Sequence, residues 1–359
     1  MQDNVITESP PRKSRHAGFE KSELERRGIE LALGAPVTGS VAVGDGVAVG
    51  FGDGTVRMFR PEAVPILWRA HRGVILCMAA DGEDVLTGGD DGRFLRISPD
   101  GVIEELANFD TKWVDCVAAS DGLAACSSGA NVYVCSSGQK RPKVFEHTST
   151  VGGLAFDKKH KRLAVTHYGG ATLWQRGKGR WNSSKLEWKG FHGPVTFSPD
   201  GRYIVTAMQE NALHGWRLRD KGHFEMAGYP TKVKSFAWVS DTPFLATSGA
   251  DETICWPFDG KEGPMGRSPV SVGRNPKQPA TYVHALRGES AVFTGFRDGA
   301  VLLAELDEMK DAVTIRGSTG IEVTAITVSA SRSHIFVGDA KGNVLWAPLW
   351  AQDEHEKTT

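Results

Sequence analysis

GFGDGTVRMF (50–59), GGDDGRFLRI (88–97) and GFRDGAVLLA (295–304) share one pattern: a small residue, a turn containing Asp or Gly, and a short run of β-forming side chains. Five further stretches follow it: SSGANVYVC (127–135), THYGGATLW (166–174), AMQENALHGW (207–216), SGADETICWP (248–257) and GDAKGNVLWA (338–347). The turn positions of the eight copies lie 38 to 47 residues apart. A period of this length predicts a repeated unit of several strands, and it decides the fold.

Each copy is preceded by two strand-like runs around another turn, as in GLAFDKKHKRLAVTH (153–167), and is followed by a variable fourth run. Helical stripes are few, and glycine is abundant, at 42 of 359 residues. We therefore predict an all-β fold, a β-propeller of four-stranded antiparallel blades, whose strands a to d run outward from the axis. Eight copies predict eight blades. Seven is the alternative if residues 110–146 or 258–300 prove irregular.

Several of these stretches resemble the WD-repeat family. FSPDGRYIVTA (197–207) is similar to that family's turn between strands a and b, and SGADETI (248–254) to its turn between strands b and c. HTSTVGGLAF (147–156) resembles its loop from strand d into strand a. No copy has the Trp-Asp pair that names the family. The resemblance spans residues 28 to 350 and implies a non-enzymatic scaffold or adaptor that docks proteins on the faces of the ring.

The two ends of the chain differ from the repeat. Residues 28–33 alternate apolar and polar side chains, and the last copy lacks a fourth strand. The resemblance implies that this N-terminal strand completes the last blade. We expect a polar extension at 1–27 (partly disordered, with a short helix possible in 18–27), a propeller at 28–350 and a polar tail at 351–359. The polar start, five scattered cysteines and the absence of a long apolar run predict a cytoplasmic protein without a membrane span.

His71, Thr87 and Asp91 match the family's internal hydrogen-bond network, in which a loop His, a strand-b hydroxyl and a turn Asp are joined. The same trio also has the residue types of a Ser-His-Asp catalytic set, with Thr87 as the nucleophile. No nucleophile-elbow sequence surrounds Thr87, so we interpret the trio as structural.

No cofactor or metal site is predicted. The eleven histidines form no HxH or HExxH motif, and the cysteines form no CxxC motif. Cys116, Cys126 and Cys135 fall on adjacent strands of one blade and could hold a soft metal ion. We interpret them instead as small apolar fillers between blades.

Two surfaces are predicted to bind partners. The first is the top face, formed by the d–a loops and b–c turns, where aromatic and Arg side chains of the kinds enriched at binding hot spots occur. Its candidate residues are Phe51, Arg72, Trp113, Tyr168, Phe296 and Arg297.

The second surface is the bottom face, formed by the a–b and c–d turns. Fifteen basic residues fall in these turns between positions 139 and 221, against three Asp residues. The central ones are Lys140, Arg141, Lys143, Lys158, Lys159, Lys161, Arg162, Arg176, Lys178 and Arg180. One interpretation is that these are solvated turns in which Lys and Arg serve solubility. The other is a docking site for an acidic protein segment. Nucleic acid and anionic lipid fit less well, because the chain has a net charge of −1 and few interleaved aromatics.

The sequence thus favours a scaffold whose partners are proteins. The alternative is a propeller with a catalytic or metal-handling site at the mouth of the channel, because fold alone does not determine function.

Overall fold

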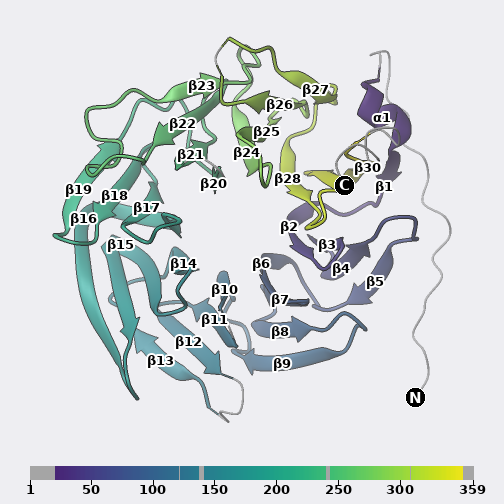
Figure 1. Ribbon diagram of the computed structural model, residues 1–359. Coiled ribbons are helices and arrows are strands. Elements are labelled where there is room, and N and C mark those ends of the chain that lie inside the picture. Colours follow the sequence, from purple (N-terminus) through teal and green to yellow (C-terminus); the bar gives the residue numbers. More distant parts are fainter. Residues whose placement is uncertain (1–20, 121, 137–140, 240–242, 308, 351–359) are drawn as a thin grey trace.

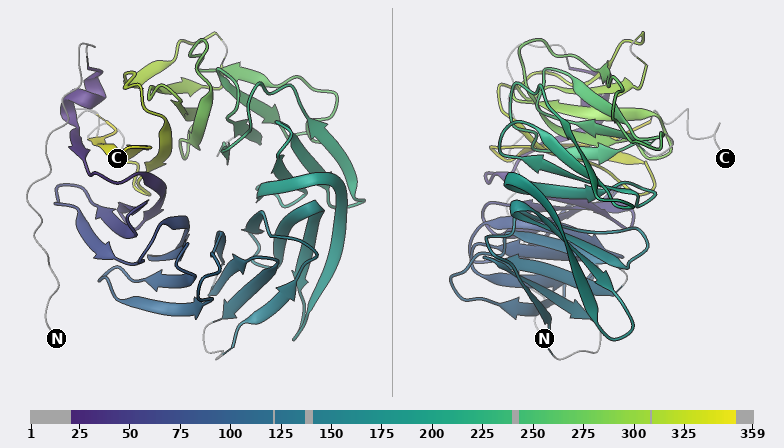
Figure 2. Two further views of the ribbon diagram at one scale, coloured as in Figure 1. Left: turned by 180° about the vertical axis from the view of Figure 1, so that it is seen from behind. Right: turned by 90° about the vertical axis from the view of Figure 1, so that its left-hand side faces the viewer.

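The computed structural model describes residues 21–120, 122–136, 141–239, 243–307 and 309–350. Its strands form seven antiparallel sheets arranged in a ring, six with four strands and one with six. Figure 1 shows the ring along its axis. The right-hand view of Figure 2 shows the ring from the side, so that its two faces lie to the left and to the right. The protein is therefore an all-β propeller, as predicted.

The first three sheets follow the chain in order. They contain β2 (Val37–Val43), β3 (Gly46–Phe51), β4 (Thr55–Phe59) and β5 (Ile66–Arg69); β6 (Ile75–Asp81), β7 (Asp84–Gly89), β8 (Arg93–Ile97) and β9 (Ile103–Asn108); β10 (Cys116–Ser120), β11 (Leu123–Ser128), β12 (Asn131–Ser136) and β13 (Lys143–Glu146).

The broad sheet follows. It contains β14 (Gly153–Phe156), β15 (Arg162–Arg176), β16 (Trp181–Phe197), β17 (Tyr203–Met208), β18 (Leu213–Arg217) and β19 (Gly222–Met226).

Three more sheets complete the ring. They contain β20 (Phe236–Trp238), β21 (Phe244–Thr247), β22 (Thr253–Pro257) and β23 (Val270–Val272); β24 (Ala280–Ala285), β25 (Ala291–Phe296), β26 (Val301–Glu305) and β27 (Val313–Arg316); β28 (Val323–Val328), β29 (His334–Asp339), β30 (Asn343–Pro348) and β1 (Ile29–Ala32).

The prediction of eight blades is not supported, and the alternative of seven matches the count of sheets. The irregularity does not lie where we expected it, because residues 116–146 form an ordinary four-stranded sheet. It lies at β16, which pairs with β15 through its first part and with β17 through its last part. This shared strand joins two of the eight repeats into the broad sheet.

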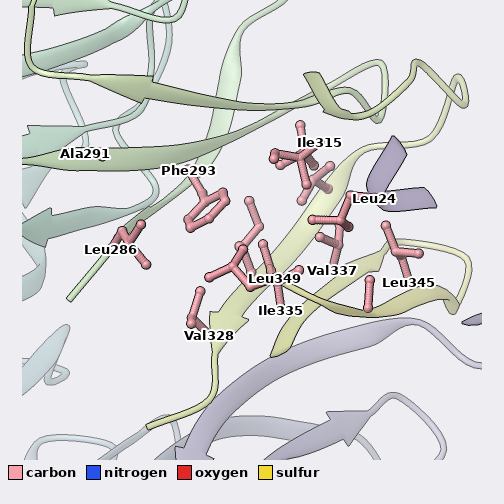
Figure 3. Close-up of a cluster of buried hydrophobic side chains, with 14 residues drawn as sticks. Leu24, Leu286, Ala291, Phe293, Ile315, Val328, Ile335, Val337, Leu345 and Leu349 are labelled. Atoms are coloured by element: carbon pink, nitrogen blue, oxygen red, sulfur yellow. The ribbon is translucent and has the colours of Figure 1, made fainter. Parts of the chain in front are cut away.

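Strand β1 closes the ring as predicted. It pairs antiparallel with β30, with Ile29 opposite Trp346 and Ala32 opposite Asn343. The short helix α1 (Glu23–Arg27) precedes it and starts with a capping box in which Ser22 and Glu25 bond each other's backbone N–H. Leu24 of this helix is buried against the last sheet (Figure 3), so the helix is part of the propeller and not of a separate extension.

The tight b–c turns depend on glycine where the chain passes close to a neighbouring loop. Gly92 has φ +77°, and a Cβ there would lie 2.2 Å from the carbonyl oxygen of Asp110. Only glycine fits both the backbone angle and the space. Gly92 therefore lets this d–a loop lie directly against the b–c turn.

Candidate functional site

The two faces of the ring are the candidate sites. Strand direction alternates within each antiparallel sheet. The d–a loops and b–c turns consequently lie on the top face, and the a–b and c–d turns lie on the bottom face.

On the top face, His71 connects its loop to the sheet of β6–β9. Its Nδ1 lies 2.9 Å from Asp91 Oδ1, and its Nε2 lies 2.8 Å from the hydroxyl of Thr87. Asp91 also accepts the backbone N–H groups of Arg72 and Arg93, at 3.0 and 3.2 Å. The predicted trio is thus one connected hydrogen-bond network.

Burial determines the protonation of this network. It lowers the pKa of His71 despite the opposing effect of Asp91, so the ring is neutral at pH 7. Burial raises the pKa of Asp91, but the N–H donors of Arg72 and His71 outweigh it and lower the pKa overall. Because the carboxylate can only accept, His71 Nδ1–H donates to Asp91 and the Thr87 hydroxyl donates to Nε2. Thr87 is 0 % exposed, so no substrate can reach its hydroxyl.

Sequence reasoning missed related contacts elsewhere in the ring. His192 of β16 places its Nδ1 2.8 Å from the hydroxyl of Thr206. Tyr229 takes the place of a histidine further round the ring, with its hydroxyl 2.7 Å from that of Thr247. His192 bonds a Thr of strand b from within β16, and Tyr229 does so from a loop, as His71 does. The differing spacing along the chain, 14 to 18 residues, hid the relation.

Two other loops use different partners. Arg316, at the end of β27, donates to Asp339 of β29 at 2.9 Å, and both side chains are buried. His147 lies in the loop after β13. Its Nε2 accepts the indole N–H of Trp174 at 3.2 Å.

The predicted top-face set divides into buried and exposed residues. Phe51 and Phe296 are each 0 % exposed, so assigning them to a docking rim was wrong. Phe51 packs in the core between β2–β5 and the last sheet and lies under the guanidinium of Arg57, 4.8 Å from ring centre to Cζ. Phe296 packs with Ala280 and Ala300. Phe51 is the last residue of β3 and Phe296 the last residue of β25, and every residue of these two strands is buried.

The other four side chains are exposed: Arg72, Trp113, Tyr168 and Arg297. The first three belong to consecutive sheets along one arc of the ring, whereas Arg297 lies across the ring beside β25 (Figure 1). The structure therefore brings together an arc of two aromatics and one arginine and not a complete rim.

On the bottom face, ion pairs divide the predicted basic sector. Arg162 is bound to the buried Asp157 at 2.9 Å. Beside β17–β19, Arg202 pairs with Asp200, and both Arg217 and Arg219 pair with Glu262, which belongs to the loop after β22. These four arginines are already neutralised within the protein.

The other central cations of this sector have no such partner. Within the part of the chain that the structure describes, no ion pair is formed by Arg141, Lys143, Lys158, Lys159, Lys161, Arg176, Lys178 or Arg180. Lys140 lies outside the described residues. The basic sector thus contracts to the turns around β13, β14, β15 and β16.

The metal alternative gains no support from the geometry. Among the described residues no group of three His, Cys, Asp or Glu side chains could hold a metal ion. Cys126 and Cys135 lie in the hydrophobic cluster between two sheets, whereas Cys116 lies in the next cluster. Burial raises the pKa of Cys116 to about 11, which keeps the thiol protonated. No helix in the described residues is long and apolar enough to cross a membrane.

Comparison with known proteins supports the resemblance inferred from the motifs. The family model described as "WD domain, G-beta repeat" matches residues 221–256, which run from β19 to β22. No curated protein matches the chain. Together with the propeller fold, the matched repeat confirms the predicted similarity to WD-repeat proteins.

Three solved structures show the same fold at low sequence identity. The computationally designed Ika8 protein has a TM-score of 0.70 at 16 % identity, covering 88 % of this chain and 97 % of that one. The RRP9 WD40 repeats have a TM-score of 0.58 at 15 % identity, covering 79 % and 96 %. U3-55K has a TM-score of 0.57 at 16 % identity, covering 78 % and 97 %.

Proposed function

We propose that this protein is a non-enzymatic scaffold that binds a partner protein on its top face. The observation that carries the proposal is the exposure of two aromatic rings on that face, 58 % for Trp113 and 65 % for Tyr168. Trp and Tyr are enriched at binding hot spots. The free cysteines agree with a cytoplasmic site of action.

The backbone beneath each ring is held in place. Tyr168 N–H donates to the hydroxyl of Ser149 at 3.0 Å, and its carbonyl lies 2.9 Å from His167 Nδ1. Both neighbours of Trp113 are bonded through their backbone. The N–H of Lys112 donates to the carbonyl of Phe109, and the N–H of Val114 donates to the carbonyl of Gly89. Rings presented from a fixed backbone lose little conformational entropy on binding, which favours affinity.

The test is affinity capture from the native cell with the full chain. The double variant Trp113→Ala, Tyr168→Ala should capture its partner about tenfold less well or worse, with an unchanged melting temperature. The matched control is Val64→Ala, Met309→Ala, which removes two other exposed apolar side chains and should keep the partner. Equal capture by both variants, or equal loss in both, would contradict the proposal.

A further inference from the structure

We infer that the bottom face carries a second docking site, for an acidic segment of a partner protein. This inference rests on the proposed scaffold function but concerns the other face of the ring. The site, called here the basic turns, consists of the a–b turn at 157–161 and the c–d turn at 177–180 with its flanking residues. Its cations are Lys158, Lys159, Lys161, Arg176, Lys178 and Arg180.

The only acidic residue of the first turn, Asp157, is bound within the protein. Asp157 is buried and accepts the backbone N–H groups of Lys161 and Arg162, both at 2.8 Å, and the guanidinium of Arg162 at 2.9 Å. Burial raises the pKa of Asp157, but these donors lower it overall, so it is ionised at pH 7. Its charge is thereby committed to Arg162, and the three lysines of the turn stay exposed and unpaired.

The second turn is held against the first. Arg176 N–H donates to the carbonyl of Lys161 at 2.8 Å, so β15 folds back on itself and its two ends meet. Gly169 and Gly170, with φ +89° and +126°, form the bend. Gly177 N–H donates to Arg180 at 2.8 Å and closes the second turn. The backbones of both turns are thus held in one area.

Packed rings support this area from below. Phe145 of β13 stacks on Trp174 with ring centroids 4.0 Å apart. The ring of Trp181 lies edge-on to that of Phe145, with centroids 5.4 Å apart. Arg176 lies opposite Trp181 in the strand register and therefore on the same side of the sheet. The backbone carrying the cations is consequently stiff, and an anionic ligand would pay little to order it.

The chemistry favours an acidic peptide over other polyanions. Single-stranded nucleic acid needs free aromatic faces for its bases, but here Trp174 and Trp181 are engaged with Phe145. No exposed large apolar residue lies within 157–161 or 177–180, so no side chain of the site would insert into a membrane and anchor it there. A net charge of −1 does not favour a long duplex, whereas carboxylates match the isolated cations of two turns.

The experiment measures fluorescence anisotropy of a labelled peptide made only of Glu and Gly with the full chain. Binding should weaken from low to physiological salt, because exposed charges are screened over about 8–10 Å. The variant Lys158→Glu, Lys161→Glu, Arg176→Glu, Lys178→Glu should bind about tenfold more weakly or worse, since each lost pair becomes a repulsion. If it does not fold, the corresponding Gln variant replaces it.

The matched control makes the same change of total charge on the top face. It is Lys112→Glu, Lys232→Glu, Lys277→Glu, Lys341→Glu, four exposed lysines without an ion pair in the described chain. This control should bind the peptide nearly as the native protein does.

Equal weakening in both variants would overturn the site, because total charge would then explain binding. A labelled DNA duplex or phosphatidylserine vesicles serve as competing ligands. If either binds the native protein more tightly than the peptide does, and the basic-turn variant loses that binding, the acidic peptide is overturned as the ligand of the site. Since the peptide assay does not involve Trp113 or Tyr168, its failure leaves the top-face scaffold function standing.

Discussion

Two positions in the ring, His71 in a loop and His192 in β16, make the same histidine–threonine contact with different support. His71 and His192 each place a ring nitrogen 2.8 Å from a strand-b hydroxyl, that of Thr87 or Thr206. The second nitrogen of His71 faces the Asp91 carboxylate at 2.9 Å. The second nitrogen of His192 is buried and makes no hydrogen bond to a carboxylate among the described residues. The repeat therefore conserves the contact geometrically but not the acid that completes it.

Aromatic packing takes the place of the acid around His192. Its ring lies 5.4 Å from that of Trp216 and 5.9 Å from that of His214, and His214 stacks on Trp188 at 4.2 Å. The ring of His71 is thus held by a directed charge and that of His192 by ring contacts. This difference teaches that one position in a repeat can be stabilised by either hydrogen bonding or burial, and the two should respond differently to substitution and to pH.

The largest effect is expected where a full ion pair ties the loop, at Arg316 and Asp339. Asp339→Ala leaves the buried guanidinium without its carboxylate, which should cost about 3–5 kcal/mol of unfolding free energy. Chemical denaturation checks this value. The double variant Arg316→Met, Asp339→Ala should be more stable than the single one. A single variant as stable as the native protein would show that the pair does not hold the loop.

The same substitution at the two histidines tests the comparison directly. His71→Phe removes two hydrogen bonds and leaves Asp91 and Thr87 without their partner, so it should cost about 2–3 kcal/mol. His192→Phe removes one hydrogen bond within an aromatic cluster and should cost about 1 kcal/mol. Denaturation curves of both variants give the two values. Equal costs would mean that Asp91 adds nothing to the network.

The parts of the fold that depend on local pattern could be predicted from the sequence. The turn motif located the b–c turns, and the alternation at 28–33 located β1. The parts that depend on contacts between distant segments could not. Glu262, which neutralises Arg217 and Arg219, lies more than forty residues beyond them. Residue type alone could not show that Phe51 turns inward, nor could eight motifs show that β16 serves two of them.

The last effect is a pH dependence, at the centre of the aromatic cluster. His214 is fully buried and neither ring nitrogen has a partner in the described chain. Burial, together with the neighbouring histidines, lowers its pKa to about 3. In the unfolded chain the pKa returns to 6.5, so that between pH 6.5 and 3 only the unfolded state is protonated. Stability must therefore fall as the pH falls through this window.

From pH 7 to pH 5, His214 should remove about 2 kcal/mol of unfolding free energy. Phe can stack on Trp188 in the same place but cannot be protonated. The variant His214→Phe should therefore be about as stable as the native protein at pH 7 and lose about 2 kcal/mol less on acidification. Denaturation of both proteins at pH 7 and pH 5 measures how much unfolding free energy each loses. The other titrating groups are the same in both proteins, so their effect cancels in the difference between the two losses. An unchanged loss in the variant would show that acid acts elsewhere, and His71, whose pKa is also lowered but is opposed by Asp91, would be the next histidine to replace.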